Sequence, residues 1–140
     1  MRIIVAFLFL AGGVLQAASP GVFTAAQAAA GKAAYESTCI ACHTASLIPA
    51  ANAKTQAGAR IPPLAGAEFL AKWGSKTAGS LANRINVAIS GFPPKGMTAQ
   101  TYIDIAAYVL QVNGGNPGPK DLEPTSMVEV RKVTAASRAR

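Results

Sequence analysis

Both cysteines and the only histidine of this chain lie within five consecutive residues, in the run Cys39-Ile40-Ala41-Cys42-His43. Two thiols in the spacing C-x-x-C, with a histidine directly after the second, are the attachment signature of a c-type haem. The two sulfurs reach the two vinyl groups on one edge of the porphyrin, and the adjacent imidazole binds the iron. We therefore predict that Cys39 and Cys42 hold one covalent haem c and that His43 is an iron ligand.

Two other chemistries that use cysteine pairs account for less of this motif. A structural zinc site takes four protein ligands, whereas the two cysteines and one histidine supply only three. A thioredoxin-like redox pair needs C-x-x-C alone, and it explains neither the histidine nor the lack of a βαβ pattern. Haem attachment explains all three side chains.

The first 18 residues have the pattern of a secretory signal peptide, because Arg2 precedes an apolar run that small residues follow. We expect cleavage near residues 17–19, since a cut at Ala26-Gln27-Ala28 would remove the helix cap expected at Thr24. The run is short for a bilayer span, and a retained membrane anchor is the alternative. Export agrees with the haem motif, since this covalent attachment takes place outside the bacterial cytoplasm. It predicts a periplasmic protein with no membrane span after cleavage.

The composition restricts the class of partner. The 140-residue chain has 13 Lys and Arg against 6 Asp and Glu, a formal net charge of +7. What remains after cleavage has the size of one small domain, to whose modest core a haem would add apolar contacts. Nucleic-acid binding is not expected, because the chain has no basic helix and no aromatic platform. The positive charge is either ordinary solvated surface or a docking face for redox proteins with acidic surfaces.

Two segments have the clearest helical patterns. Thr24-Ala25-Ala26-Gln27 has the form of a capping box, which predicts a helix over about 24–37 that leads directly into the haem motif. The strongest apolar stripe lies in residues 99–112, which we expect to be capped by Thr98 and ended by Asn113-Gly114-Gly115. These two helices should supply most of the core.

The residues between these helices are more irregular. Residues 44–60 show no period and are predicted to form a loop. Residues 61–66 should be extended, because their prolines exclude a helix. Shorter helices are expected over 67–73 and 80–90. With no strand pattern and no repeat, residues 19–115 are predicted to be one all-α domain with long loops.

Residues 116–140 differ in composition from the rest of the chain. They contain three prolines, few large side chains and a basic end. This composition predicts an extended or disordered basic tail.

Taken together, the segments resemble a known family. The runs GKAAYESTCIACH, PPLAGAEFLAKW and YIDIAAYVLQVNG are similar to those of class I cytochrome c domains, in particular small periplasmic cytochromes that accept electrons from dehydrogenases. The similarity covers about residues 24–115. It implies an orthogonal helical bundle around one covalent haem, which shuttles single electrons between a periplasmic dehydrogenase and a downstream acceptor. It implies no catalysis by the chain itself.

The resemblance also gives roles to further residues. It implies that the Pro62 carbonyl accepts the Nδ1 hydrogen of the haem histidine, which fixes the tautomer and raises the basicity of the ring. Trp73 would form a wall of the haem site, with its N–H toward a propionate. Gly31 and Tyr35 would pack across the last helix near Tyr108, where a glycine lets two backbones approach closely.

The sixth iron ligand departs from the family pattern. The resemblance implies a methionine just before a proline pair on the loop ahead of the last helix, but that position is Phe92, which cannot bind iron. Either the loop is rearranged and Met97 reaches the iron, or Phe92 covers this face and the iron is five-coordinate. We predict Met97 as the ligand, because an open iron is the less common design.

Three functions are compatible with these residues. The first, electron transfer by a free carrier, is the prediction. In the second, the chain is the bound haem subunit of an oxidoreductase complex and its tail clasps a partner. In the third, a five-coordinate haem binds small ligands, although no second histidine exists for distal acid–base chemistry. For the carrier, four lysines in or near segments expected around the haem would steer an acidic partner: Lys54, Lys72, Lys76 and Lys95.

Overall fold

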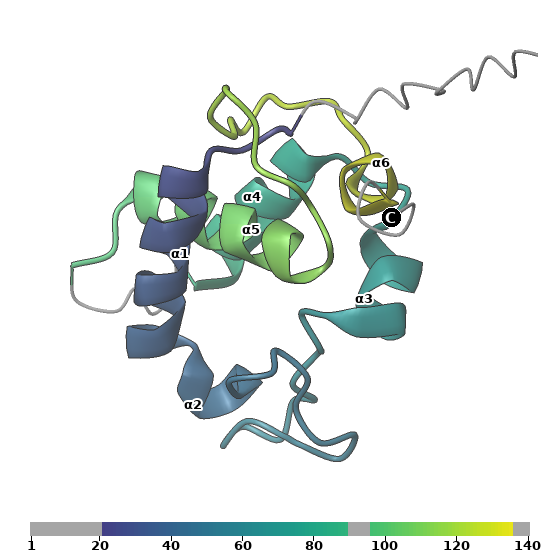
Figure 1. Cartoon of the computed structure of the whole chain (residues 1–140). Coiled ribbons are helices and arrows are strands. Elements are labelled where there is room, and N and C mark those ends of the chain that lie inside the picture. The colour runs from purple at the N-terminus through teal and green to yellow at the C-terminus, as the bar shows by residue number, and fades with distance from the viewer. Residues whose placement is uncertain (1–20, 90–95, 136–140) are drawn as a thin grey trace, which may run out of the picture.

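The computed structural model describes residues 21–89 and 96–135, and within these ranges it confirms the predicted all-α fold (Figure 1). The helices are α1 (Ala25–Thr38), α2 (Ile40–His43), α3 (Gly66–Trp73), α4 (Ala78–Ile89), α5 (Ala99–Val112) and α6 (Val130–Thr134). The β-structure of the described residues is limited to two isolated bridges. No helix in these ranges combines the length and apolarity that crossing a bilayer requires. The predicted signal peptide, residues 1–18, lies outside the described residues.

The two predicted helix caps are both present. The Thr24 hydroxyl accepts a hydrogen bond from the Gln27 backbone N–H at 3.2 Å, and the Thr24 N–H donates to the Gln27 side chain at 3.4 Å. Thr98 and Thr101 make the same reciprocal pair at the start of α5. Such pairs satisfy backbone donors that the first helical turn leaves without partners. The sequence therefore specifies locally where α1 and α5 begin.

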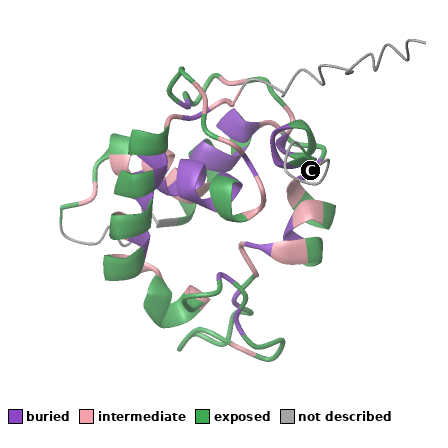
Figure 2. Ribbon diagram, in the orientation of Figure 1, coloured by how far each residue is buried: buried purple, intermediate pink, exposed green. Residues whose placement is uncertain are grey.

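Helix α5 forms the centre of the core, in contact with both α1 and α4 (Figure 1). Figure 2 shows the buried residues gathered on α5 and on the sides of α1 and α4. The buried positions of α5 include Tyr102 and the continuous run Ile105–Leu110. A helix that is apolar over most of its circumference in this way must be covered by other elements.

The crossing of α1 and α5 depends on Gly31, as predicted. A Cβ atom added at this residue would lie 1.8 Å from the carbonyl oxygen of Asp104, so the two backbones touch where a side chain would otherwise stand. One turn further along α1, the rings of Tyr35 and Tyr108 pack at a centroid distance of 5.4 Å and an angle of 54°. This contact fixes the end of α1 that leads into the haem motif.

The shorter helices also lie close to their predicted positions. Helix α3 ends at Trp73 and Gly74 follows it, as expected. Helix α4 begins at Ala78, before the predicted residue 80. The reason is Thr77, whose hydroxyl accepts a hydrogen bond from the Ser80 backbone N–H at 3.1 Å and so caps the helix.

The tail requires a correction to the sequence prediction. Over residues 116–135 it is neither disordered nor detached; it runs back along the domain and forms α6 (Figure 1). Leu122, Val130 and Val133 are buried. The buried side chain of Gln27 donates to the Leu122 carbonyl at 3.2 Å and accepts from the Leu122 N–H at 2.6 Å. Buried apolar area and backbone hydrogen bonds thus offset the entropy cost of ordering this proline-containing segment.

Candidate haem site

The haem motif sits at the junction of α1 and α2. Helix α1 ends at Thr38, Cys39 forms its cap, and residues 40–43 make a single helical turn that ends at the histidine. The Tyr35 hydroxyl donates to the Thr44 carbonyl at 2.7 Å, which ties the end of this turn back to the core. Thr44 itself has a φ of 62°, so the chain turns sharply away directly after His43.

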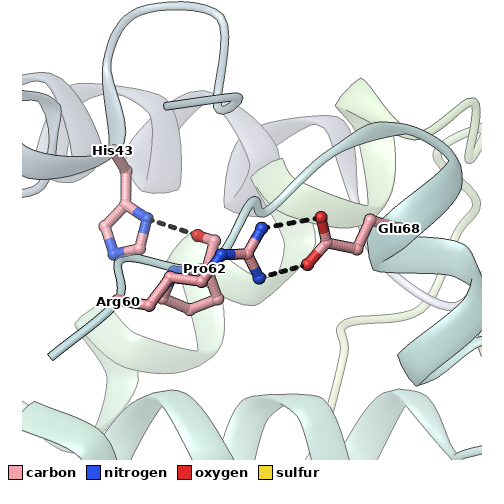
Figure 3. Close-up of polar contacts among 4 residues, drawn as sticks. All are labelled: His43, Arg60, Pro62 and Glu68. Atoms are coloured by element: carbon pink, nitrogen blue, oxygen red, sulfur yellow. Dashed lines mark hydrogen bonds and ion pairs between the residues drawn. The ribbon is translucent and has the colours of Figure 1, made fainter. Parts of the chain in front are cut away.

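His43 and Pro62 make the contact that the resemblance implied. The His43 Nδ1 lies 3.1 Å from the Pro62 carbonyl oxygen (Figure 3). A carbonyl can only accept, so Nδ1 carries the hydrogen and Nε2 of the neutral ring keeps a free lone pair. Burial lowers the pKa of His43, although the hydrogen bond to Pro62 opposes this shift. A neutral imidazole with Nε2 unprotonated is the form that binds iron.

The segment that carries Pro62 is tied to the domain by Asn113, the residue that ends α5. Its side-chain N–H₂ donates to the Leu64 carbonyl at 2.9 Å, and its side-chain oxygen accepts from the Gly66 N–H at 3.1 Å. The same N–H₂ group also donates to the Val109 carbonyl at 2.8 Å. The sequence identified Asn113 only as a helix stop, because its partners Leu64 and Gly66 are far away in the chain.

A surface ion pair flanks the same segment. The Arg60 guanidinium makes two parallel bonds to the Glu68 carboxylate, at 2.6 and 2.9 Å (Figure 3). The hydrogen bond from Arg60 lowers the pKa of Glu68. Both side chains are more than half exposed, so water and salt screen the pair. It therefore adds little to the placement of Pro62 beside the buried contacts.

A cavity of about 340 Å³ opens beside the haem motif, and five of the six predicted site residues line it. These are Cys39, Cys42, His43, Pro62 and Trp73. The rest of its lining is mostly apolar and comes from the proline segment, α4 and α5: Pro63, Leu64, Leu81, Ile85, Ala88 and Ile105. The fold thus brings the predicted residues together on the walls of a single apolar cavity.

The lining also contains Thr38 and two cations. Lys72 lies on α3 and Arg84 on α4, and both residues are exposed. Among the described residues, Arg84 makes no side-chain hydrogen bond or ion pair that would occupy its guanidinium. From the sequence, Lys72 was expected near the haem only as a charge that steers an acidic partner, and Arg84 was given no role. Its position one residue before Ile85, on the α4 face that meets the cavity, was the available signal.

Trp73 forms part of the cavity wall at the end of α3. Its ring stacks near Phe69, with a centroid distance of 6.5 Å, and the Lys76 ammonium lies 5.5 Å from the Trp73 ring centroid. Phe69 is buried, so Trp73 is anchored on one side and lines the cavity on the other. These contacts hold the wall in place.

The cavity fits a haem by its chemistry. A porphyrin is flat and apolar and carries two carboxylates, and the lining offers apolar side chains together with two cations. Neither cysteine takes part in a disulfide, so both thiols are free to form thioethers. Burial raises the pKa of Cys39, and the nearby Cys42 adds to the shift. Among the described residues, no three His, Cys, Asp or Glu side chains gather as a metal-binding group.

Met97 is the predicted site residue that the structure does not bring to the cavity. It lies half-buried against the hydrophobic core, directly before the Thr98 cap of α5, and it is not among the cavity-lining residues. Phe92, the competing residue, lies outside the described residues. The two arrangements proposed for the sixth coordination position thus stay as predictions.

Comparison with known proteins identifies the family. The family model described as cytochrome C oxidase, cbb3-type, subunit III matches residues 26–109, which is more than half of the chain. Comparisons with curated proteins and with solved structures gave no match. The matched range contains the haem motif, Pro62, Trp73 and most of α5, and domains of this kind transfer electrons through a haem iron. This chain therefore belongs to that family of c-type cytochrome domains.

Proposed function

We propose that this protein is a periplasmic electron carrier with a single covalent haem, which shuttles electrons between an exported dehydrogenase and a downstream acceptor. The observation that supports it most is the His43–Pro62 hydrogen bond, at 3.1 Å, on the wall of an apolar cavity that both cysteines share. When bound, haem iron supplies reversible one-electron chemistry. The chain positions that group and sets its potential, and it makes or breaks no substrate bond.

Each lining residue has a distinct part in this proposal. Cys39 and Cys42 supply the two thioether sulfurs, and His43 supplies an iron ligand through Nε2. Pro62 holds the imidazole in one tautomer and orientation through its carbonyl. Lys72 and Arg84 would balance the charge of the two propionates, and the indole N–H of Trp73 would donate a hydrogen bond to one of them. The apolar lining keeps water away, which favours the ferrous form.

The sixth ligand in this proposal is Met97, and its assignment is testable on its own. A thioether–iron bond gives a charge-transfer band in the ferric absorption spectrum, and Met97→Ala should abolish it. The second candidate function, small-ligand binding at a five-coordinate iron, is favoured by the position of Met97 outside the cavity lining. Carbon monoxide binding by the untreated ferrous protein, with no thioether band, would support that alternative and contradict the Met97 assignment.

Electron exchange with an acidic partner is the direct functional test. The side chains of Lys54, Lys72 and Lys76 are exposed in the structure, and Lys95 lies outside the described residues. Steering by these lysines predicts a second-order rate that falls as ionic strength rises. A rate that does not change with salt would contradict lysine steering. Recovery of the loaded protein from the periplasmic fraction, with residues 1–18 removed, tests the proposed location.

A further inference from the structure

Residues 124–131, which we call the strap, lie beyond the range that the family model matches. They run beside residues 74–79, which join α3 to α4 and include the first two residues of α4, and which we call the link. Four backbone N–H groups join the two segments. Ala78 donates to the Val128 carbonyl at 2.8 Å and Gly79 to Ser126 at 3.0 Å; in return, Val130 donates to Lys76 at 2.9 Å and Arg131 to Gly74 at 3.0 Å. The strap therefore pairs with the whole length of the link.

Side-chain contacts fix the strap at both of its ends. At one end, a Cβ added to Gly79 would lie 2.3 Å from the Pro124 carbonyl oxygen, so the strap touches α4 where the helix has no side chain. At the other end, the Arg131 Nε donates to the Gly74 carbonyl at 3.1 Å. Val130, between the paired amides, is fully buried. These contacts make the strap an integral part of the fold.

The link that the strap holds connects two walls of the haem cavity. Trp73 and Lys72 line the cavity at the end of α3, directly before the link. Leu81, Arg84 and Ile85 line it from α4, directly after the link. The geometry of residues 74–79 thus sets the distance between these walls. Since the strap holds that geometry through four backbone bonds, it also acts on the closure of the cavity.

We propose that the strap positions the α3 and α4 walls and thereby raises the reduction potential of the haem, an inference that rests on the proposed function. Ferric haem carries one more positive charge than ferrous haem, and water stabilises that charge. Walls held together exclude water and favour the reduced form. Gly79 and Arg131 are positioning residues in this account, because they act on the cavity only through the link.

The test compares three variants of the full-length, haem-loaded protein. Gly79→Ala drives a methyl group into the Pro124 carbonyl, while alanine favours the helix that it enters. Arg131→Ala removes the side-chain bond to Gly74, the exposed ion pair with Glu129 at 3.4 Å and one positive charge. Lys132→Ala is the matched control, because it removes the same charge from the neighbouring, exposed position. Two properties are measured for each: the midpoint potential, and the hydrogen exchange of the Ala78 and Val130 amides.

We expect Gly79→Ala to have the fastest amide exchange and the lowest midpoint potential. Arg131→Ala should be intermediate, and Lys132→Ala should lie closest to the wild type in both properties. For Gly79→Ala we expect the equilibrium constant for reduction by a one-electron reference couple to fall about tenfold. This corresponds to a decrease of about 59 mV in the midpoint potential. The ferric spectrum should stay that of the wild type, because His43 is held by another wall. If Gly79→Ala does not fold, the comparison of Arg131→Ala with Lys132→Ala still decides the question.

If Gly79→Ala and Arg131→Ala exchange these amides faster but have the same midpoint potential as Lys132→Ala, the proposal is overturned. The strap would then be structural only. Unchanged amide exchange in Gly79→Ala and Arg131→Ala would overturn it as well, because the described contacts would not hold the link. Failure of the proposed function is recognised separately: the wild-type protein would carry no haem at all, before any variant is compared.

Discussion

The two sides of the haem cavity are held by different means. On the ligand side, Gly31, Tyr35 and Asn113 fix the haem motif and the proline segment through a close backbone contact and partly buried hydrogen bonds. On the opposite side, the α3 and α4 walls depend on backbone pairing with the strap. The first set lies within or next to the family-matched residues, and the strap lies beyond them. The comparison indicates that the iron ligand is held by contacts of the shared domain, whereas the link between the α3 and α4 walls pairs with a segment outside the match.

The largest effect is expected from a change at the crossing that supports the ligand side. Gly31→Ala would place a methyl group 1.8 Å from the Asp104 carbonyl oxygen, so the two helices must separate. We expect the free energy of unfolding to fall by about 3 kcal/mol, measured by chemical denaturation. Ala33→Ser, on the exposed face of the same helix, should change it by less than about 0.5 kcal/mol. Equal effects of the two variants would contradict the close approach.

An intermediate effect is expected at the end of α5. Asn113→Ala leaves the Leu64 carbonyl and the Gly66 N–H without their partner, at a cost of about 2 kcal/mol in unfolding free energy. Because the same segment carries Pro62, the hydrogen bond to His43 should also loosen. The check is thermal unfolding together with the Nδ1–H resonance of the haem histidine by NMR. If Asn113→Ala is destabilised but its Nδ1–H resonance is unchanged, the contacts of Asn113 with the proline segment do not determine the placement of His43.

A smaller, pH-dependent effect is expected at Tyr35. Tyr35→Phe keeps the packing against Tyr108 but loses the 2.7 Å bond to the Thr44 carbonyl, at a cost of about 1 kcal/mol near neutral pH. Burial raises the pKa of Tyr35, so the folded state holds this proton more tightly than the unfolded state. Its contribution to stability is therefore complete below about pH 10 and declines as the pH rises further.

The measurement for Tyr35 is the free energy of unfolding of both proteins from pH 7 to pH 11. The wild type should lose more stability than Tyr35→Phe above about pH 10, so the difference between them shrinks. A difference that stays constant over this range would show that the Tyr35 hydroxyl is not buried as described.

The smallest effect on the ligand side is expected from the exposed pair beside Pro62. Arg60→Ala should leave the unfolding temperature and the His43 environment unchanged, because both partners are screened by water. It should, however, raise the pKa of Glu68, since the hydrogen bond from Arg60 is the main cause that keeps it low. An NMR titration of the Glu68 carboxyl measures this. A loss of haem ligation in Arg60→Ala would contradict the minor role given to the pair.

The features that were predictable from sequence are those set by local patterns. Capping boxes mark the starts of α1 and α5, and the C-x-x-C-H spacing brings three side chains together within one helical turn. The contact of His43 with Pro62 was expected only through the family resemblance, because it joins α2 to a proline segment that is distant in the chain. The role of Asn113 was missed, since it depends on distant neighbours that periodicity cannot identify. Arg84 was missed although its place on the same α4 face as Leu81 and Ile85 was a signal.

The tail, residues 116–135, shows most clearly what the sequence could not reveal. Its prolines and small residues have the composition of a disordered segment, yet Val130 is buried and its amide is paired. The partner groups are backbone atoms of the α3–α4 link and the side chain of Gln27, and neither leaves a pattern within the tail itself. Backbone pairing between distant segments of this kind is set by the tertiary fold.

The central claim is that Cys39 and Cys42 hold a haem covalently, and intact-protein mass spectrometry of material from an export-competent host tests it most directly. The account predicts a red protein whose mass exceeds that of the mature polypeptide by one haem, an increment that survives denaturation. In the double variant Cys39→Ser, Cys42→Ser, this increment should be lost. A colourless wild-type protein with the mass of the bare polypeptide would contradict the account.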